Sequence, residues 1–219
     1  MSDLSVIMPL HDAGPWVGEA IASVLDRADG LLELIVVDDG STDDGPDVAR
    51  RFGDPVRVLA QPGRTGPAAA RNAGLAAARG DVLGFLDADD LWLAGAPDPR
   101  RPGLRHAEAV AGRLQPLDAA ARPIRQPAGS MGLATLLMRR AVWERHGGLD
   151  PALVYSEDVD WLLRLREAGV RFAAVPDVVF GQRLRPGSLT RDRAATERGL
   201  AGALAASLRR RGALGGSAS

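Results

Sequence analysis

The first half of the chain alternates between short apolar runs and segments with apolar residues on one helical face. The apolar runs predict strands at residues 4–10, 31–37, 56–60 and 81–86. The segments between them predict helices over 15–27, from Ser41 or Thr42 to about Phe52, and from Pro67 to about Arg79. Repeated strand–helix units of this length indicate an α/β fold, in which two helical layers enclose a mainly parallel central sheet.

The second half is less regular, and the elements predicted there are shorter. We expect a proline-rich loop at 94–103, a short helix at 104–112, and a hairpin of 113–117 with 121–125. Further predicted elements are a strand at 131–138, helices at 140–146, 157–168 and 193–211, strands at 171–175 and 178–180, and a disordered tail at 215–219.

Polar residues follow all four predicted strands of the first half, at positions 11–12, 38–39, 61 and 87–89. Ligands of parallel sheets bind at the carboxyl ends of the strands, so these residues mark a candidate site. Asp87, Asp89 and Asp90 would repel one another unless they share a cation, and their oxygens suit Mg²⁺ or Mn²⁺. Taken alone, Asp-x-Asp is more often a solvated acidic turn followed by a helix cap.

Composition excludes several classes of protein. The 219 residues suffice for one buried domain, and a formal net charge of -1 argues against nucleic-acid binding. Without lysine or cysteine there is no lysine Schiff base, Walker-type phosphate loop, disulfide or thiolate nucleophile. We find no secretory signal pattern and no apolar run near the ~20 residues of a membrane span, so we expect a cytoplasmic protein.

Five segments in this order resemble glycosyltransferase family 2. They are VIMPLHDAGPWVGEAIASVL, IVVDDGSTDD, GPAAARNAGLAAARGDVLGFLDADDLW, YSEDVDWLLRLREAGVRF and QRLRPGSLTR, and together they extend over about residues 4–191. The resemblance implies the GT-A fold and transfer of a sugar from a nucleotide diphosphate with inversion. It divides the chain into a GT-A domain at 1–191, with a nucleotide-binding half at 1–92 and an acceptor half at 93–191, and a C-terminal helix and flexible tail at 192–219.

The resemblance also implies which residues bind the donor. Pro9 and His11 would lie near the base, although the family usually has Pro-x-Tyr-Asn here, which makes the identity of the base less certain. Asp39 would accept the uracil N3–H, with Asp38 helping, unless the two aspartates only cap the next helix. Arg71 would contact the uracil carbonyl or the phosphates; the alternative is an arginine on a helix surface.

For the metal and the chemistry, the resemblance implies two acidic clusters with different tasks. Asp89 would be the principal ligand of Mn²⁺ or Mg²⁺, and Asp87 would contact the ribose or the metal. Asp158 is our candidate general base and Glu157 the second candidate, with helix capping as the rival explanation. Arg185 stands where the family often has histidine, and it would bind the leaving diphosphate, with Arg183 as a second candidate contact.

The sequence thus predicts a metal-assisted, inverting glycosyltransferase that uses a UDP-sugar. Its hydroxyl acceptor, shaped by residues 94–135, is a glycan, a lipid-linked molecule, a small molecule or a peptide. The alternatives are an inactive nucleotide-sugar-binding protein or a partner-dependent subunit and, with less support, a sugar nucleotidyltransferase. The C-terminal helix packs on its own domain by default, while a peripheral membrane contact or a homodimer stays open.

Overall fold

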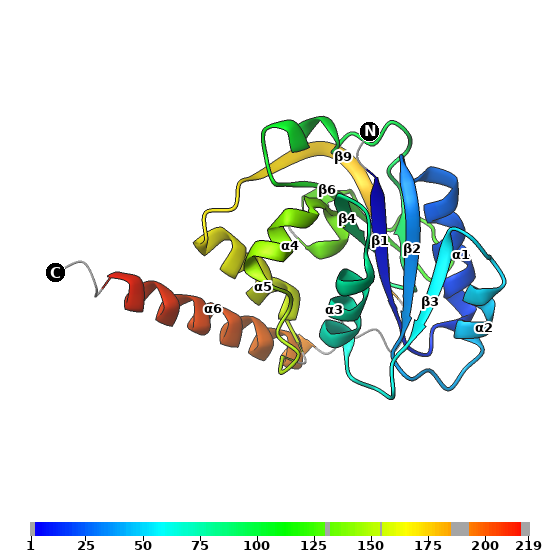
Figure 1. Ribbon diagram of the computed structural model, residues 1–219, viewed down its shortest axis with the longest axis horizontal. Helices are drawn as coiled ribbons and strands as arrows, with labels where there is room; N and C mark the ends of the chain where they lie inside the picture. The colour runs from blue at the N-terminus through cyan, green and yellow to red at the C-terminus, as the bar shows by residue number, and fades with distance from the viewer. Residues whose placement is uncertain (1–2, 130–131, 154, 185–192, 216–219) are drawn as a thin grey trace.

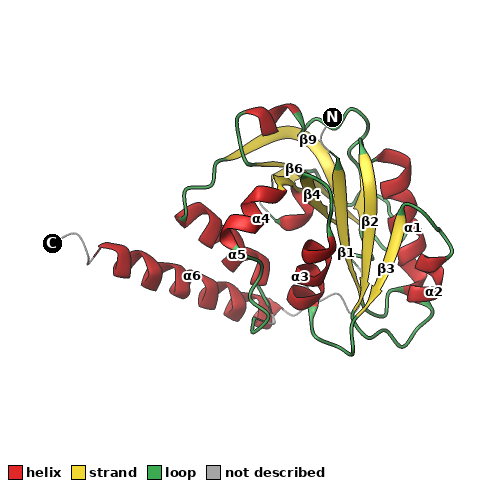
Figure 2. Cartoon of the chain, viewed as in Figure 1, coloured by secondary structure: helices red, strands yellow, loops and turns green. Residues whose placement is uncertain are grey.

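The computed structural model describes residues 3–129, 132–153, 155–184 and 193–215 (Figures 1 and 2). The helices are α1 (Gly14–Arg27), α2 (Gly45–Arg50), α3 (Pro67–Ala77), α4 (Arg140–His146), α5 (Glu157–Glu167) and α6 (Arg193–Gly215), with 3₁₀ turns η1 (Pro102–Arg105) and η2 (Leu133–Thr135). The strands are β1 (Leu4–Leu10), β2 (Leu31–Asp38), β3 (Val56–Ala60), β4 (Val82–Phe85), β5 (Leu91–Trp92), β6 (Ala109–Leu117), β7 (Ala128–Gly129), β8 (Leu136–Arg139) and β9 (Phe172–Arg183).

The strands form one mixed sheet in the order β3-β2-β1-β4-β8-β6-β9-β5, with β7 beside β6. The first four strands of this order are parallel to one another. Strand β8 runs antiparallel to both β4 and β6, whereas β6 and β9 are parallel to each other. The sheet therefore combines a parallel half with a half that contains both antiparallel and parallel pairs.

Successive side chains of the central strands point to opposite faces of this sheet, as the pleat of a strand requires. In β1, Leu4, Val6 and Met8 pack into the core under α1, whereas Ile7 packs into the core under α3. Because both faces of these strands are buried, they read in the sequence as continuous apolar runs. Helices α1 and α2 cover one face and α3, α4 and α5 the other (Figure 1), so the predicted three-layer α/β/α fold is confirmed.

The helix predicted from Ser41 or Thr42 begins later, at Gly45. The backbone N–H of Thr42 donates to Asp12 Oδ1 at 2.7 Å, and Ser41 Oγ accepts from the Asp12 N–H at 3.3 Å. These bonds hold the loop after β2 against the loop after β1, and they replace the helix cap that we expected.

The short helix predicted at 104–112 is wrong. Only η1 overlaps its start, and Ala109, Val110 and Ala111 belong to β6, buried between β8 and β9. A short apolar run cannot by itself distinguish a buried helix from a buried strand, and here the neighbouring strands decide.

The two strands predicted at 171–175 and 178–180 are one strand, β9. Pairing with β6 shifts register around Gly112, where Ala111 pairs with Ala174 but Arg113 pairs with Val178. The residues near Pro176 thus form an irregularity in the pairing of β9 with β6, as is usual for proline inside a sheet.

The predicted hairpin after β6 forms only in part. Asp118 Oδ1 accepts the N–H groups of Ala120 and Arg122, both at 2.9 Å, and makes the turn. Beyond it, Leu117 and Pro123 form an isolated bridge, and the strand that pairs with β6 is β7. The strand predicted from residue 131 is described only from η2, and it begins at Leu136.

Helix α6 packs on α5, which confirms the default expectation for the C-terminal segment. Arg210 Nε donates to Glu167 Oε2 at 2.6 Å, and Ser207 also donates to Glu167. The helix ends at Gly215, and the rest of the predicted tail lies outside the described residues. Within the part of the chain that the structure describes, no helix is both long and apolar enough to cross a membrane.

Candidate active site

The four parallel strands end at one edge of the sheet, and polar residues follow each of them. Leu10 of β1 lies beside Asp38 of β2, and Asp38 beside Ala60 of β3. Strand β4 pairs with β1 up to Phe85 and leads into Asp87. The strand order thus brings together loops that are far apart in the sequence.

The first-strand motif lies against the acidic pair that follows β2. Pro9 is half-buried beside Val37. His11 Nδ1 is 3.0 Å from the carbonyl oxygen of Asp39, so this nitrogen carries the proton and donates. His11 Nε2 lies 3.5 Å from Asp12 Oδ2. The imidazole ring therefore stands at the sheet edge next to the residues predicted to bind the base.

The Asp39 carboxylate holds the loop that leads into α3. Its Oδ1 accepts the Thr65 N–H at 2.6 Å and the Thr65 hydroxyl at 2.7 Å, and its Oδ2 accepts the Gly66 N–H at 2.8 Å. Asp38 Oδ1 accepts the Ser41 N–H at 2.9 Å and shapes its own turn. The sequence suggested Asp39 as a ligand of the base but gave no sign of its contacts with the loop before α3.

Arg71 of α3 joins the two acidic clusters. Its Nη2 donates to Asp87 Oδ1 at 2.6 Å and its Nη1 donates to Glu157 Oε1 at 2.7 Å. Arg71 and Glu157 are each 8% exposed. Arg71 is thus a buried bridge at the centre of the candidate site, which excludes the alternative of an arginine on a helix surface.

The charges at this bridge perturb one another. Burial raises the pKa of Glu157, and the negative charges of Asp158 and Asp87 raise it further, although Arg71 opposes the shift. Burial by itself would lower the pKa of Arg71, but the charges of Asp87 and Glu157 outweigh it, so that pKa is raised. Arg71 therefore stays protonated, and its buried Nε has no hydrogen-bond partner among the residues that the structure describes.

Asp158 lies beside the bridge without an ion-pair contact to Arg71 among the bonds described. It is half-buried on the first turn of α5, and its Oδ1 accepts the N–H of Val159 at 2.8 Å. Its charge contributes to the raised pKa values of both Arg71 and Glu157, which places it within electrostatic reach of both. The two candidate bases thus differ, because Glu157 is buried and ion-paired while Asp158 remains accessible.

The last aspartate of the acidic turn is structural. Asp90 is 5% exposed, and its Oδ1 accepts the Arg183 N–H at 2.6 Å. Arg183 Nε donates to the Asp89 carbonyl at 2.9 Å, and its Nη2 donates to Glu19 Oε2 at 2.6 Å. The sequence suggested a shared cation for Asp90, with an acidic turn before a helix cap as the alternative, and a diphosphate contact for Arg183. Instead the pair ties the end of β9 to the acidic turn, which continues into strand β5 and not into a helix.

Asn72 and Trp161 also hold parts of the fold together. The Asn72 side chain pairs with the backbone of Leu149, accepting its N–H at 2.9 Å and donating to its carbonyl at 2.8 Å. Trp161 is fully buried and packs edge-on against Phe85, with 6.3 Å between the two ring centroids. Its indole N–H donates to the Gly147 carbonyl at 2.9 Å. Residue Arg185, the predicted diphosphate ligand, lies outside the described residues.

The acidic turn fits a divalent cation of the predicted kind. Burial raises the pKa of Asp90 well above its ordinary value, and the negative charges of Asp87 and Asp89 raise it further. The described residues contain no group of three acidic or histidine side chains arranged around a metal position. Mg²⁺ commonly binds through one or two carboxylates together with substrate phosphates, so Asp87 and Asp89 would suffice once a diphosphate is bound.

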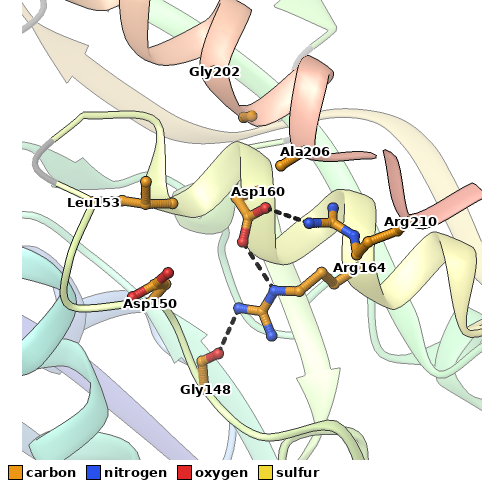
Figure 3. Close-up of a pocket in the computed structure, with 9 residues that line it drawn as sticks. Gly148, Asp150, Leu153, Asp160, Arg164, Gly202, Ala206 and Arg210 are labelled. Atoms are coloured by element: carbon orange, nitrogen blue, oxygen red, sulfur yellow. Dashed lines mark hydrogen bonds and ion pairs between the residues drawn. The ribbon is translucent and has the colours of Figure 1, made fainter. Parts of the chain in front are cut away.

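A separate pocket of about 410 Å³ lies between α5, α6 and the loop before α5 (Figure 3). Asp160 stands at its centre, where Arg164 Nε donates to Oδ2 at 2.9 Å and Arg210 Nη1 donates to Oδ1 at 3.1 Å. Asp160 thus faces two arginines. The pocket is lined by Gly148, Asp150, Leu153, Asp160, Arg164, Gly202, Ala203, Ala206 and Arg210, none of which belongs to the sheet edge.

The chain is similar in sequence to known glycosyltransferases. Residues 5–97 match the family model described as "Glycosyl transferase family 2". An uncharacterized glycosyltransferase of Haemophilus influenzae is 41% identical over 90 residues, which cover 40% of this chain and 36% of the relative. The succinoglycan biosynthesis protein ExoU of Rhizobium meliloti is 28% identical over 229 residues, which cover 86% of this chain and 64% of the relative. The chain therefore spans less than two thirds of the length of these relatives.

Solved structures of S. aureus TarS share the fold. The structure of TarS 1–349 in complex with UDP has a TM-score of 0.70 at 18% identity, covering 84% of this chain and 61% of that chain. The complex with UDP-GlcNAc has a TM-score of 0.71 at 18% identity, covering 85% and 60%. The expected GT-A fold is confirmed. Residues 5–97 thus match glycosyl transferase family 2 in sequence, and the TarS structures show that the chain has the same fold.

Proposed function

We propose that this protein transfers a sugar from a UDP-sugar to a hydroxyl acceptor with inversion at the anomeric carbon. The observation that carries this proposal is the bridge from Asp87 through Arg71 to Glu157 at the carboxyl edge of the sheet. The TarS structures in complex with UDP and UDP-GlcNAc support the choice of donor.

In the proposed reaction, Asp158 is the general base. The acceptor oxygen attacks the anomeric carbon, the bond from that carbon to the diphosphate oxygen breaks, and Asp158 takes the hydroxyl proton. UDP leaves on the opposite face. Glu157 is less suited to this task, because it is buried and bound to Arg71. Asp158 is half-buried and adjacent, and a base must be within hydrogen-bond reach of the acceptor hydroxyl.

Arg71 would act by positioning both acidic clusters. Its guanidinium neutralises part of a cluster that also contains Asp87, Glu157 and Asp158. We propose that this bridge fixes the donor side, at Asp87, relative to the acceptor side, at Glu157 and Asp158. Positioning of this kind lowers the barrier because reacting groups are held in place before the reaction starts.

Asp39 is our proposed acceptor for the N3–H of uracil, with Pro9, His11 and Asp38 around the base. A carboxylate offers about four lone-pair sites. Three donors from Thr65 and Gly66 already occupy Asp39, so one site remains for the base. The same carboxylate would then bind the nucleotide and hold the loop beneath it.

Asp87 and Asp89 would hold Mn²⁺ or Mg²⁺. When bound, the ion would neutralise the charge that develops on the departing diphosphate. The carboxylates of Asp87, Glu157 and Asp158 act on the one guanidinium of Arg71, and Asp89 adds a further negative charge in the acidic turn, so a bare diphosphate would be repelled. Arg185 is proposed as a second diphosphate contact on the sequence alone.

The acceptor would bind to the half of the chain after residue 92. Within this half, Arg100 does not contribute, because it is fully buried and pairs with Asp98 at 2.7 Å. The exposed part of the segment after β6, at residues 122–126, remains accessible to an acceptor.

A thermal-shift screen tests the proposal. UDP-GlcNAc, UDP-glucose and UDP-galactose would be compared with GDP-mannose and ADP-glucose, each with Mn²⁺. A ligand that binds only the folded state raises its stability by mass action, so a UDP-sugar should raise the melting temperature most. No shift with any UDP-sugar would refute the donor assignment. Release of UDP from the best ligand then separates an active enzyme from an inactive nucleotide-sugar-binding protein.

A further inference from the structure

Helix α6 touches Tyr155 and Ser156, the two residues that immediately precede Glu157 and Asp158. A Cβ atom built on Gly199 would lie 2.8 Å from Tyr155 Cβ, 2.9 Å from Ser156 Oγ and 3.0 Å from the Tyr155 carbonyl oxygen. The carbonyl oxygen is backbone and Cβ is the root of its side chain, so neither can move aside without moving the chain. Only glycine allows α6 to approach this closely.

The segment beneath Gly199 has an unusual backbone. Ser156 has φ of 60°, in the left-handed region, and it is the residue before α5 begins at Glu157. A non-glycine residue keeps this conformation only when its surroundings hold it there. Its carbonyl oxygen accepts the Asp160 N–H at 3.0 Å and so starts the helix that carries Glu157 and Asp158.

The other end of the α5–α6 contact is held by charge. Arg210 donates to Glu167 at 2.6 Å and to Asp160 at 3.1 Å, and Ser207 donates to Glu167. Hydrogen bonds from Arg210 and Ser207, opposed by burial, lower the pKa of Glu167, so this carboxylate stays charged. Figure 3 shows Arg210 reaching from α6 to Asp160 on α5. The contact between α5 and α6 thus combines close packing at Gly199 with ion pairs made by Arg210.

We propose that α6 is a positioning element for Glu157 and Asp158 at the start of α5. The close contact at Gly199 holds the Tyr155–Ser156 turn in place. Through this turn, α6 sets the orientation of the Glu157 and Asp158 side chains at the start of α5. Gly199 and Arg210 are therefore positioning residues for the reaction, although neither belongs to the sheet edge. The inference rests on the proposed function for the role of Glu157 and Asp158, but the mechanical coupling from α6 to residues 155–160 does not.

The chain supplies a matched control on the same helix. A Cβ built on Gly202 meets nothing within 4 Å. Gly199→Ala and Gly202→Ala add the same methyl group and the same gain in helix propensity. Only the first forces α6 away from Tyr155 and Ser156.

Three measurements on both variants test the proposal. They are the rate of UDP release from UDP-GlcNAc with Mn²⁺, the affinity for UDP by calorimetry, and hydrogen exchange of the backbone amides of residues 155–160. For Gly199→Ala we expect a fall in kcat on the order of 10- to 100-fold, because small displacements of reacting groups are costly. UDP affinity should change less than about twofold, and exchange over residues 155–160 should rise. Gly202→Ala should match the wild type in all three.

Equal kcat and equal exchange for the two variants would overturn the proposal. So would a loss of UDP affinity as large as the loss of kcat, because the effect would then be general and not confined to the base. If Gly199→Ala does not fold, Arg210→Gln replaces it, with the exposed neighbour Arg209→Gln as its control and the same expected differences. If the wild type releases no UDP from any donor, the proposed function fails, and hydrogen exchange alone still decides whether α6 controls residues 155–160.

Discussion

Arg71 Nη1 lies 2.7 Å from Glu157 Oε1 across 86 positions of the sequence. The other terminal nitrogen of the same guanidinium binds Asp87. One arginine on α3 thus connects the acidic turn after β4 with the start of α5. Among the described residues, no hydrogen bond joins the acidic turn directly to the start of α5. The relative position of these two segments therefore depends on the Arg71 side chain.

Replacing Arg71 should therefore cost stability as well as activity. Arg71→Met leaves Glu157 buried without its ion-pair partner, and breaking a buried pair typically costs roughly 3–5 kcal/mol. Arg50→Met is the control, because Arg50 is half exposed and its pair with Asp47 is of the surface kind that is worth little. Urea unfolding measures both. A loss for Arg71→Met no larger than that of the control would contradict the bridging role.

Asp158→Asn should retain donor binding and lose sugar transfer. Losing a general base typically lowers the rate about 10²- to 10⁴-fold. UDP release and UDP affinity measure the two effects, and the exposed Asp150→Asn is the control. Turnover of Asp158→Asn at the wild-type rate would show that the base is another residue.

Removing divalent metal should weaken UDP but not uridine. The ion would contact the diphosphate, which uridine lacks, so EDTA should lower UDP affinity alone. Asp89→Asn should resemble EDTA treatment and should gain little from added Mn²⁺. Calorimetry with both ligands measures this, and a UDP affinity that is unchanged in EDTA would exclude the metal.

A buried carboxylate outside the site should make stability depend on pH. Glu33 Oε1 accepts from the Ser5 hydroxyl and the Arg79 N–H, each at 2.8 Å. Burial alone would raise the pKa of Glu33, but these bonds and its pair with Arg57 outweigh it and lower that pKa. The stability that Glu33 contributes is complete above its unfolded pKa of about 4.3 and is lost as the pH falls through its lower folded value.

Glu33→Gln tests this. The difference in unfolding free energy between wild type and variant should be largest near neutral pH and should shrink in acid, below about pH 4. Urea unfolding across this range measures it. A difference that stays constant with pH would mean that Glu33 acts through its shape and not through its charge.

The strands of the parallel half of the sheet could be predicted from the sequence, because each is a short apolar run with polar residues at its end. The bounds predicted for β1 and β3 are those observed. In the other half, residues 109–112 were predicted as helix but belong to strand β6, because a buried strand flanked by two others carries no alternation.

In the candidate site, sequence order located the strand-end residues but not their partners. The bonds from Arg71 to Glu157 and from Arg183 to Asp90 join residues 86 and 93 positions apart. No local pattern encodes contacts at that separation. A charged residue shortly after an apolar run, as Arg183 is after residues 178–180 in β9, was the available signal that a buried partner exists.

The tie between Arg183 and the acidic turn determines where the chain tolerates changes in length. Asp89 and Asp90 are held from β9, so an inserted residue in this turn would break bonds on both sides. Residues 122–126 are exposed and begin with the last residue of the Asp118 turn. Insertions and deletions between related proteins should therefore collect at 122–126, where the acceptor half can diversify while the acidic turn keeps its length.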